Sequence, residues 1–484
     1  MSRWTDAMIR EALDLATPAV PLVFSDVGTD SRTIAADQLF VALCGERFDA
    51  HAFLGNVAER GVKAAVVSHV PQDAPAGLHY YVVDDTLKAL GRLGRYRRRR
   101  LGVRVCAVTG SNGKTTTKEM LRAVLGVKYR VHATTGNLNN QVGTPLTLLA
   151  TPDDAEVVVA ELGTSLPGEI EILGDIVEPD AAVVTAVSEE HLEGLGSLEG
   201  VLKEEVSILD AVDPAGFAVV ADEPAELPEA ARSHSLRVKV AGWTERADEE
   251  LRARDVHLDS NGEVHFRWQN SHVHVPLRGR HNARNALIAL GVALEWGISI
   301  EEAIGALAQL KPAKMRGEVH QYGELIVIAD CYNANPASTA AALDLLVSMP
   351  RERRKVAVLG SMLEMGSVSA DVHARVAREA ASLDIDVIVA TGEFVDAFRP
   401  LASQVCGELI LESDPMNAVE PLLSRLRGDE IVLLKGSRGV ALERLLPHLE
   451  NYGSAPPPRG GRKAGGEKAH RDVKTTSSAE HSHD

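Results

Sequence analysis

At 484 residues the chain is too long for one ordinary domain, and its length predicts roughly three. Hydrophobic residues make up 45% and charged residues 25%, an ordinary globular balance with material for several cores. The net charge of −17 argues against a nucleic-acid partner, and the sequence has neither a secretory signal nor an apolar run near the roughly 20 residues that cross a bilayer. We therefore expect a cytoplasmic protein without membrane insertion, and we expect a monomer.

Residues 1–100 are predicted to form a small α/β domain, because short apolar strands (LFVAL, AAVVS and YYVVD) alternate there with helical stretches. The segment ends in a cluster of arginines, namely Arg92, Arg95 and Arg97 to Arg100. This cluster could bind phosphate or an acidic lipid, but a solvated helix end before a linker is the simpler interpretation. The cysteines are far apart and predict reduced thiols in cores: Cys44, Cys106, Cys331 and Cys406.

Residues 101–310 are predicted to form a central domain on a parallel sheet. The apolar runs RVCAVT, EVVVAE and DAAVVTAV alternate with helical patterns, as in sheets covered by helices on both faces. Between residues 216 and 278, alternating segments flank Asn261-Gly262, a pair typical of tight hairpins. A small antiparallel annex is therefore expected within this domain.

Residues 311–450 are predicted to form a second doubly wound α/β domain, with strands at ELIVIAD, KVAVLG, DVIVATG and EIVLLKG. Residues 451–484 are polar and rich in Pro, Gly and Ser. This tail cannot bury enough apolar surface to fold and is predicted to be disordered. The expected fold class is thus α/β, with three domains and a tail.

The most specific motif is VRVCAVTGSNGKTTTKEML, in which a strand ends at Thr109 and Lys114-Thr115 open a helix. Glycines let backbone N–H groups curl around phosphate oxygens, and a helix N-terminus adds partial positive charge. Lys114 can reach terminal phosphates, and the Thr115 hydroxyl can ligate Mg²⁺. The first Gly of the general pattern would fall at Val108, but the order of strand, glycines and helix still predicts a nucleotide site. Its residues are Gly110, Ser111, Asn112, Gly113, Lys114, Thr115 and Thr116.

TGSNGKTTTKEM resembles the ATP loop of the Mur ligases and of the folylpolyglutamate synthetases. Later stretches resemble, in the expected order, the Mur ligases that join D-alanyl-D-alanine to UDP-N-acetylmuramoyl-tripeptide. These stretches are GNLNNQVGTPLTLL, AELGTS, EEHLEGLGSLEGV, GRHNARNAL, DCYNANPAS and VLLKGSRG. The chain is therefore identified as a member of the Mur ligase family.

The resemblance implies a UDP-substrate-binding domain at residues 1–100, a central ATPase domain at 101–310 and a C-terminal Rossmann-like domain at 311–450. It implies an ATP-dependent, Mg²⁺-using ligase of peptidoglycan synthesis, which serves cell shape and division. In this family the γ-phosphate of ATP moves to the substrate carboxylate. The incoming amine then attacks the acyl phosphate, and Mg²⁺ offsets the developing charge.

The resemblance also assigns metal ligands. Glu161, at the end of the strand EVVVAE, would complete the first Mg²⁺ site with Thr115, and His191 would lie at the second. Without the resemblance, a Glu at a strand end is more often a cap or loop residue, and a His in a loop is more often a surface group. Lys114, Glu161 and His191 are the expected catalytic residues of the central domain.

The family usually places a carbamylated lysine fourteen residues after that histidine, where this chain has Glu205. Lys203 is the nearest lysine, but two positions on a helix differ by roughly 200°, so both cannot face one site. Glu205 lies on a predicted apolar stripe formed by Leu198, Val201, Leu202, Ile208 and Leu209. We predict that Glu205 supplies a catalytic carboxylate to the second metal site without carbamylation. A salt bridge at the helix edge and a modified Lys203 are the alternatives.

Nucleotide contacts outside the loop rest on the resemblance alone. Asn282 and Asn285 are assigned to the adenine side, although Asn near a helix start is more often a cap. Arg316, in the hinge before the third domain, is a candidate phosphate contact or an exposed hinge cation. Asp330 would face the ribose.

Substrate contacts are implied in the first and third domains. Asn333 and Asn335 are expected near the reacting groups as catalytic residues, with Ser338 beside them. Lys435 and Arg438 could hold a carboxylate of the incoming dipeptide, or cap the sheet edge.

The segment TDSRTIAADQLFVALCGERFDAHAF resembles the uridine-nucleotide pocket of the family. Ser31 and Arg32 are the best candidates for UDP contacts, and Arg47 and His51 are weaker ones. Ala50 stands where relatives commonly have Gly, a small departure from the family pattern.

Two other functions remain open. One is a sister ligase of the Mur or folylpolyglutamate type; the first domain and YNANP argue against the latter, and the absence of a DNPR-type motif argues against the former. The other is a nucleotide-binding scaffold without catalysis, an interpretation that the absence of the family's carbamylated lysine would favour. Retention of Lys114, Thr115, Glu161 and His191 argues against a scaffold.

Overall fold

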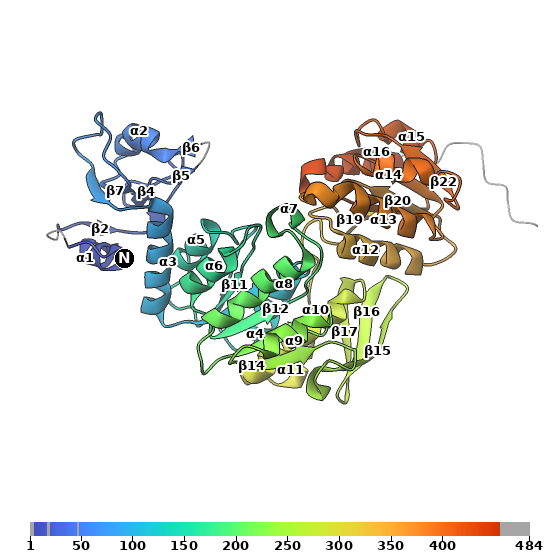
Figure 1. The fold of residues 1–484 in the computed structure, drawn as a ribbon, viewed down its shortest axis with the longest axis horizontal. Helices are drawn as coiled ribbons and strands as arrows, with labels where there is room; N and C mark the ends of the chain where they lie inside the picture. The colour runs from blue at the N-terminus through green and yellow to red at the C-terminus, as the bar shows by residue number, and fades with distance from the viewer. Residues whose placement is uncertain (1–3, 17–19, 46–47, 455–484) are drawn as a thin grey trace, which may run out of the picture.

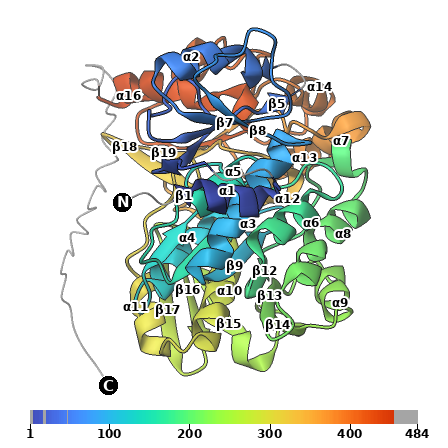
Figure 2. The same ribbon diagram turned by 90° about the vertical axis from the view of Figure 1, so that its left-hand side faces the viewer.

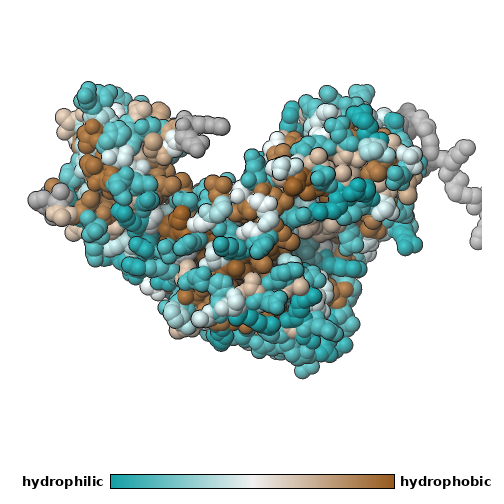
Figure 3. All heavy atoms as spheres, in the orientation of Figure 1, coloured by the Kyte–Doolittle hydropathy of each residue, from teal (hydrophilic) through white to brown (hydrophobic). Residues whose placement is uncertain are grey.

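A computed structural model describes residues 4–16, 20–45 and 48–454, which form three lobes in chain order along the long axis of the molecule (Figure 1). The N-terminal lobe is blue, the central lobe is cyan to yellow, and the C-terminal lobe is orange to red. Teal residues cover most of the central and C-terminal lobes in the same view, and brown ones gather where these lobes meet and on the N-terminal lobe (Figure 3). Within the described residues, no helix combines the length and apolar character needed to cross a membrane.

The N-terminal lobe contains a parallel sheet in the order β3-β4-β7-β8. The strands are β3 (Val27–Gly28), β4 (Leu39–Val41), β7 (Ala64–Val67) and β8 (His79–Val82). Each face carries its own core. Helix α1 (Asp6–Leu13) packs on one face with the strand pair β1 (Trp4–Thr5) and β2 (Val23–Phe24), and α2 (Leu54–Glu59) packs on the other. The predicted apolar runs thus form three of the four strands.

Helix α3 (Thr86–Leu101) joins the first lobe to the second, packing against α1 and against α5 (Gly143–Leu149) and α6 (Glu169–Val177) of the central lobe (Figure 2). Arg99 and Arg100 at its end are exposed as predicted, but Arg97 and Arg98 are not. Arg97 is buried, donates to the Thr151 carbonyl at 2.9 Å and pairs with Asp153. Arg98 donates to the Val177 and Glu178 carbonyls at 3.1 and 2.6 Å. The solvated-helix interpretation is therefore wrong for Arg97 and Arg98, whose partners lie far away in the sequence.

The central lobe contains an all-parallel sheet in the order β10-β11-β9-β12-β13-β14. Its strands are β9 (Arg104–Thr109), β10 (Val131–Ala133), β11 (Val157–Glu161), β12 (Ala181–Val184), β13 (Phe217–Ala221) and β14 (Arg237–Ala241). The middle strands are buried on both faces, which explains their continuous apolar sequences. The helices are α4 (Lys114–Leu125), α5, α6, α7 (Leu192–Leu195), α8 (Leu198–Val206), α9 (Glu226–Arg232), α10 (His281–Glu295) and α11 (Ile300–Leu307).

The predicted annex is an antiparallel sheet of β15 (Ala253–Leu258), β16 (Glu263–Trp268) and β17 (Ser271–Arg278), and Asn261-Gly262 lies in its first turn. Its inner face is apolar, and its outer face carries histidines. The His265 ring lies 4.4–5.5 Å from the rings of His257, His272 and His274. Burial first, and then the neighbouring histidines, lowers the pKa of His265 below its usual value.

The C-terminal lobe contains a sheet in the order β18-β19-β23-β20-β21-β22, in which only β18 is antiparallel to its neighbour. The strands are β18 (Glu318–Tyr322), β19 (Leu325–Asp330), β20 (Lys355–Leu359), β21 (Val387–Ala390), β22 (Glu408–Leu411) and β23 (Ile431–Lys435). The helices are α12 (Pro336–Ser348), α13 (Ser369–Ala381), α14 (Phe394–Phe398), α15 (Val419–Leu423) and α16 (Leu446–Ser454).

Two predictions need correction here. Residues 451–454 complete α16 and do not begin the disordered tail; the rest of the tail, 455–484, lies outside the described residues. Cys106 and Cys331 are buried as predicted, but Cys44 and Cys406 are exposed on the N-terminal and C-terminal lobes.

Candidate active site

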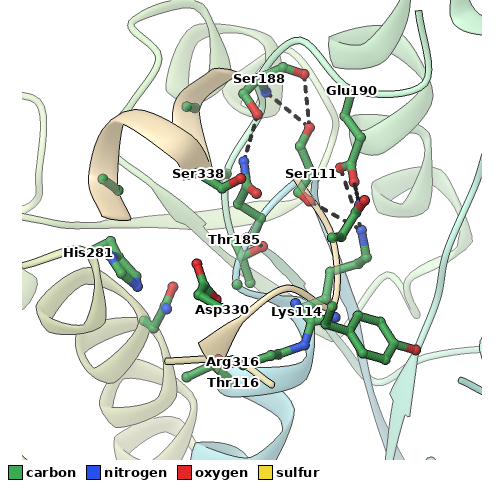
Figure 4. Close-up of a pocket in the computed structure, with 18 of the residues that line it drawn as sticks. Ser111, Lys114, Thr116, Thr185, Ser188, Glu190, His281, Arg316, Asp330 and Ser338 are labelled. Atoms are coloured by element: carbon green, nitrogen blue, oxygen red, sulfur yellow. Dashed lines mark hydrogen bonds and ion pairs between the residues drawn. The ribbon is translucent and has the colours of Figure 1, made fainter. Parts of the chain in front are cut away.

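A cleft of about 1130 Å³ separates the central and C-terminal lobes, large enough for a nucleotide and part of a second substrate. Its walls come from the carboxyl ends of parallel strands in both sheets, where α/β proteins bind ligands. Most of the predicted nucleotide and catalytic residues line it. Figure 4 shows Lys114, Glu190, Arg316, Asp330 and Ser338 around it.

The phosphate loop has the predicted order of elements. Strand β9 ends at Thr109, and α4 begins at Lys114. Gly110 and Gly113 have φ values of +124° and +86°, and a Cβ on Gly113 would lie 2.7 Å from the Asn285 side-chain oxygen. Only glycine meets both demands without strain. The Lys114 Nζ donates to the Gly110 carbonyl at 2.5 Å and so lies over the mouth of the loop.

Glu161 ends β11 and lies beside the helix that carries Thr115. The Thr115 hydroxyl donates to Glu161 Oε1 at 3.2 Å, and the Asn139 amide donates to the same oxygen at 3.1 Å. Glu161 Oε2 is buried without a hydrogen-bond donor and lies 3.8 Å from the ammonium of Lys118. A buried carboxylate oxygen beside a hydroxyl is the hard donor pair that suits Mg²⁺, so these residues fit that ion.

Glu205 is buried on α8, and Lys203 is exposed. The predicted faces of this helix are therefore right for both residues, although Leu198 of the predicted stripe is 40% exposed. Glu205 Oε2 accepts from the Thr109 hydroxyl at 2.5 Å and from the Gly110 N–H at 2.8 Å. Burial is the largest cause of a raised pKa for this carboxyl. Glu205 thus contacts the phosphate loop from behind. It is not among the described residues that line the cleft.

Glu161, His191 and Glu205 do not converge. Across the described residues, no three His, Cys, Asp or Glu side chains are grouped to hold a metal ion. The His191 Nδ1 pairs with Glu364 of the C-terminal lobe. Only the Thr115–Glu161 half of the predicted metal set is therefore brought together.

Sequence reasoning missed Glu190. Its side chain is 6% exposed, its Oε1 accepts from the Asn333 amide at 2.8 Å, and its Oε2 lies 4.0 Å from the Lys114 Nζ. The motif EEHLEG contains this residue, but two consecutive glutamates before a histidine carry no signal of their own. The contacts that single it out come from segments far away in the sequence.

The third lobe brings its predicted residues to the same cleft. Asn335 caps α12, and its side-chain amide exchanges hydrogen bonds with that of Asn112, at 3.0 and 3.3 Å. Ser338 lies one turn along, donating its backbone N–H to the Asn335 side-chain oxygen. The Lys435 Nζ is buried, 3.0 Å from Asp330 Oδ2, and also donates to the Asn333 carbonyl.

The hinge side of the cleft is cationic. The Arg316 guanidinium lies 4.4 Å from the centre of the Tyr332 ring, a cation–π contact that holds it at the cleft wall. Arg438 also lines the cleft and pairs with Glu443 at 2.8 Å. These two side chains are therefore already positioned by protein partners.

The far end of the cleft holds the predicted base-binding asparagines. The Asn282 amide donates to the Arg278 carbonyl at 2.7 Å, and the Asn285 amide donates to the Asn282 oxygen at 3.1 Å. Beside them, Arg284 stacks over Trp243 at 4.0 Å and pairs with fully buried Asp222 at 2.6 Å. Protein partners therefore already hold the side chains of this rim in place.

The N-terminal lobe has a second, separate pocket of about 600 Å³, which includes Ser31 and Arg32 and is bordered by Phe48 and Phe53. Arg32 forms two hydrogen bonds to Asp30, which lower the pKa of that carboxyl to about 2. Arg47 lies outside the described residues.

His51 is used in building the N-terminal lobe. It is 4% exposed, pairs with Asp49 at 2.6 Å, and accepts from the Ser68 N–H at 3.0 Å. Its ring thus has protein partners already, and its weaker assignment as a UDP contact stays a prediction.

Comparisons with known proteins match both lobes of the cleft. The family model described as Mur ligase middle domain matches residues 108–293, and the one described as Mur ligase, glutamate ligase domain matches residues 315–438. The chain belongs to the Mur ligase family. The resemblance seen in the sequence is confirmed, and with it the three-domain α/β fold class.

Similar proteins extend over all three lobes. The UDP-N-acetylmuramoyl-tripeptide--D-alanyl-D-alanine ligase of Bacillus subtilis (strain 168) is 36% identical over 436 residues, which are 88% of this chain and 93% of that protein. The ligase of the same name from Escherichia coli (strain K12) is 34% identical over 93% of this chain and 99% of that protein. A crystal structure of MurF from Acinetobacter baumannii matches with a TM-score of 0.84 at 34% identity over 93% of this chain and 99% of that one. A crystal structure of MurF from Thermotoga maritima in complex with ADP matches with a TM-score of 0.77 at 27% identity, over 88% of this chain and 97% of that one.

Proposed function

We infer that this protein is an ATP-dependent ligase that joins D-alanyl-D-alanine to UDP-N-acetylmuramoyl-tripeptide, giving the UDP-muramoyl pentapeptide of peptidoglycan synthesis. The observation that carries the inference is the similarity to ligases of this name along nearly the whole chain, at up to 36% identity among those cited. That similarity covers 88% and 93% of this chain in the two ligases cited.

The proposed reaction begins with ATP in the cleft between the central and C-terminal lobes. Lys114 and the loop N–H groups would hold the phosphates while the γ-phosphate moves to the tripeptide carboxylate. The dipeptide amine then attacks the acyl phosphate, the new C–N bond forms, and the C–O bond to phosphate breaks. Thr115 and Glu161 would hold Mg²⁺, which supplies positive charge opposite the phosphates and the developing oxyanion.

The remaining residues take proposed roles from their places in the structure. Asn282 and Asn285 would face the adenine, Asp330 the ribose, and Arg316 the phosphates. His191 would serve the second metal site.

Glu205 is proposed to support the phosphate loop from behind as a hydrogen-bond acceptor, and its direct metal ligation stays a prediction. On the substrate side, Lys435 and Arg438 would orient the dipeptide with Ser338 and Asn335. Ser31, Arg32 and Arg47 would meet the UDP portion.

Three further proposals concern organisation. We place the domain boundaries near residues 100 and 310, and the sheet composition of each lobe supports this division. We propose that the enzyme is a monomer, to be checked by light scattering. We also propose that it works in the cytoplasm.

The test is to supply purified protein and Mg²⁺-ATP with UDP-muramoyl-tripeptide and one amine at a time. D-alanyl-D-alanine should yield the pentapeptide by mass spectrometry. L-glutamate, the amine of a folylpolyglutamate-type ligase, should yield nothing. Product with a different amine in place of the dipeptide would overturn the assignment in favour of a sister ligase.

A further inference from the structure

The loop that follows β12 is bonded to both sides of the cleft. On the phosphate-loop side, Ser188 accepts from the Asn112 amide at 2.7 Å and its own N–H donates to the Ser111 hydroxyl at 3.0 Å. On the other side, Glu189 pairs with Arg375, and in α7, directly after the loop, the Glu193 N–H donates to the Glu364 carbonyl at 3.1 Å. The loop is therefore a bridge between the phosphate loop and the C-terminal lobe.

Glu190 lies at the centre of this bridge, with its carboxylate directed toward the phosphate loop (Figure 4). One oxygen accepts from Asn333 of the C-terminal lobe at 2.8 Å. The other is buried without a hydrogen bond and lies 4.0 Å from the Lys114 ammonium. A single carboxylate thus contacts the docked lobe with one oxygen and the phosphate-binding lysine with the other.

Burying such a carboxylate is unfavourable unless donors or a cation compensate it. Asn333, which donates a hydrogen bond to Glu190, belongs to the lobe across the cleft, and the His191 Nε2 lies farther away, 3.6 Å from the same oxygen. If the C-terminal lobe moves away, Glu190 loses that donor and Lys114 loses a fixed counter-charge. The Asn112–Asn335 amide pair would break in the same movement.

We propose that Glu190 is a positioning residue that couples docking of the C-terminal lobe to the phosphate loop. When the lobe docks, Asn333 forms its hydrogen bond to Glu190. The Glu190 carboxylate then positions the Lys114 ammonium to contact the phosphoryl group that is transferred. The C-terminal lobe, which we expect to carry the dipeptide, thereby sets the geometry of phosphoryl transfer. The coupling rests on the proposed ligase function only for its kinetic consequence.

The docking half is tested without catalysis. The exposed cysteines, Cys44 and Cys406, lie on the N-terminal and C-terminal lobes, so the wild-type chain can be labelled there with a fluorescent donor and acceptor. The N-terminal lobe is joined to the central lobe through α3. With Mg²⁺-ATP present, Glu190→Ala and Asn333→Ala should each change the energy-transfer efficiency, and the double variant should change it no further. Unchanged transfer in Glu190→Ala would overturn the proposal.

The catalytic half is tested by steady-state kinetics on the same variants. Glu190→Ala should lower kcat about tenfold or more while changing the KM for ATP less than about threefold, and Asn333→Ala should not add to it. Glu190→Gln keeps an oxygen for Asn333 but loses the charge that faces Lys114. It should therefore restore wild-type energy transfer and leave kcat low.

Glu199→Ala, which removes an exposed carboxylate on α8, is the matched control and should match the wild type in both assays. Fully additive losses in kcat from Glu190→Ala and Asn333→Ala would refute the coupling. If the wild type makes no pentapeptide, the proposed function fails and the energy-transfer result still decides the docking role.

Discussion

The sharpest single test of the site concerns Glu205, whose carboxylate supports the phosphate loop from behind. Glu205→Ala removes the acceptor of the Gly110 N–H, at 2.8 Å, and of the Thr109 hydroxyl, at 2.5 Å. The hydroxyl has a second acceptor, the Leu162 carbonyl at 3.2 Å, so it can be satisfied without Glu205. The Gly110 N–H is then left buried without this partner.

An orphaned buried donor costs about 1–3 kcal/mol, and the cavity left by the side chain adds to it. Removing a desolvated charge returns part of this loss, since burial is what raises the pKa of Glu205. We therefore expect Glu205→Ala to lower the unfolding free energy of the central lobe by about 2–3 kcal/mol. Glu205→Gln keeps an acceptor oxygen and should lose less than about 1 kcal/mol.

Thermal unfolding measures this difference, and hydrogen exchange in peptides that span residues 104–117 locates it. In the Glu205→Gln variant these peptides should be as protected from exchange as in the wild type, and in Glu205→Ala they should exchange faster. The activity of Glu205→Gln then separates the two roles. A support role predicts activity near wild type, whereas an inactive Gln variant with wild-type stability and exchange would refute our reasoning and favour direct metal ligation. A carbamate found on Lys203 by intact mass would also contradict it.

Three further outcomes are expected. Arg97→Ala should destabilise the protein by about 1–3 kcal/mol, because it removes a buried side chain and leaves the carbonyl of buried Thr151 without this donor. Exposed Arg100→Ala should cost less than about 0.5 kcal/mol, and equal thermal shifts for the two variants would restore the solvated-helix interpretation. Asp222→Ala should lower the free energy of unfolding by about 3–5 kcal/mol, because it leaves Arg284 without its fully buried partner. A denaturation midpoint close to that of the wild type would contradict a structural role for this ion pair. The pKa of His265 is lowered in the folded protein, so as pH drops below about 6.5 the unfolded chain takes up the proton first and stability falls. His265→Gln should therefore reduce the fall in melting temperature between about pH 7.5 and pH 5.5. An equally large fall in the variant would show that other groups cause the pH dependence.

The parts of the fold that were predictable have local causes. Strand β9 ends at Thr109 and α4 begins at Lys114 because an apolar run meets glycines and then a helix former, all within one short motif. An Asn-Pro pair is likewise a local signal for a turn, and Asn335, before Pro336, caps α12. The burial of Glu205 followed from helical periodicity alone.

The parts that could not be predicted depend on contacts between distant segments. Strands β18 and β22 lie at the edges of their sheet, so their mixed polar sequences did not stand out from loops. Arg97 looked solvated because its partners, near residues 151–153, are brought to it only by the packing of α3 on the central lobe. Glu190 is defined by Lys114 and Asn333, which belong to different lobes, and no pattern along the chain joins these three residues.

The central claim is that ATP is consumed to join two specific substrates. The direct measurement is phosphate release from Mg²⁺-ATP by the purified protein, with UDP-muramoyl-tripeptide and D-alanyl-D-alanine supplied together and each omitted in turn. We predict sustained release only when both are present, in step with formation of the pentapeptide. Release that ignores the dipeptide, or none with both substrates despite measurable ATP binding, would contradict the account.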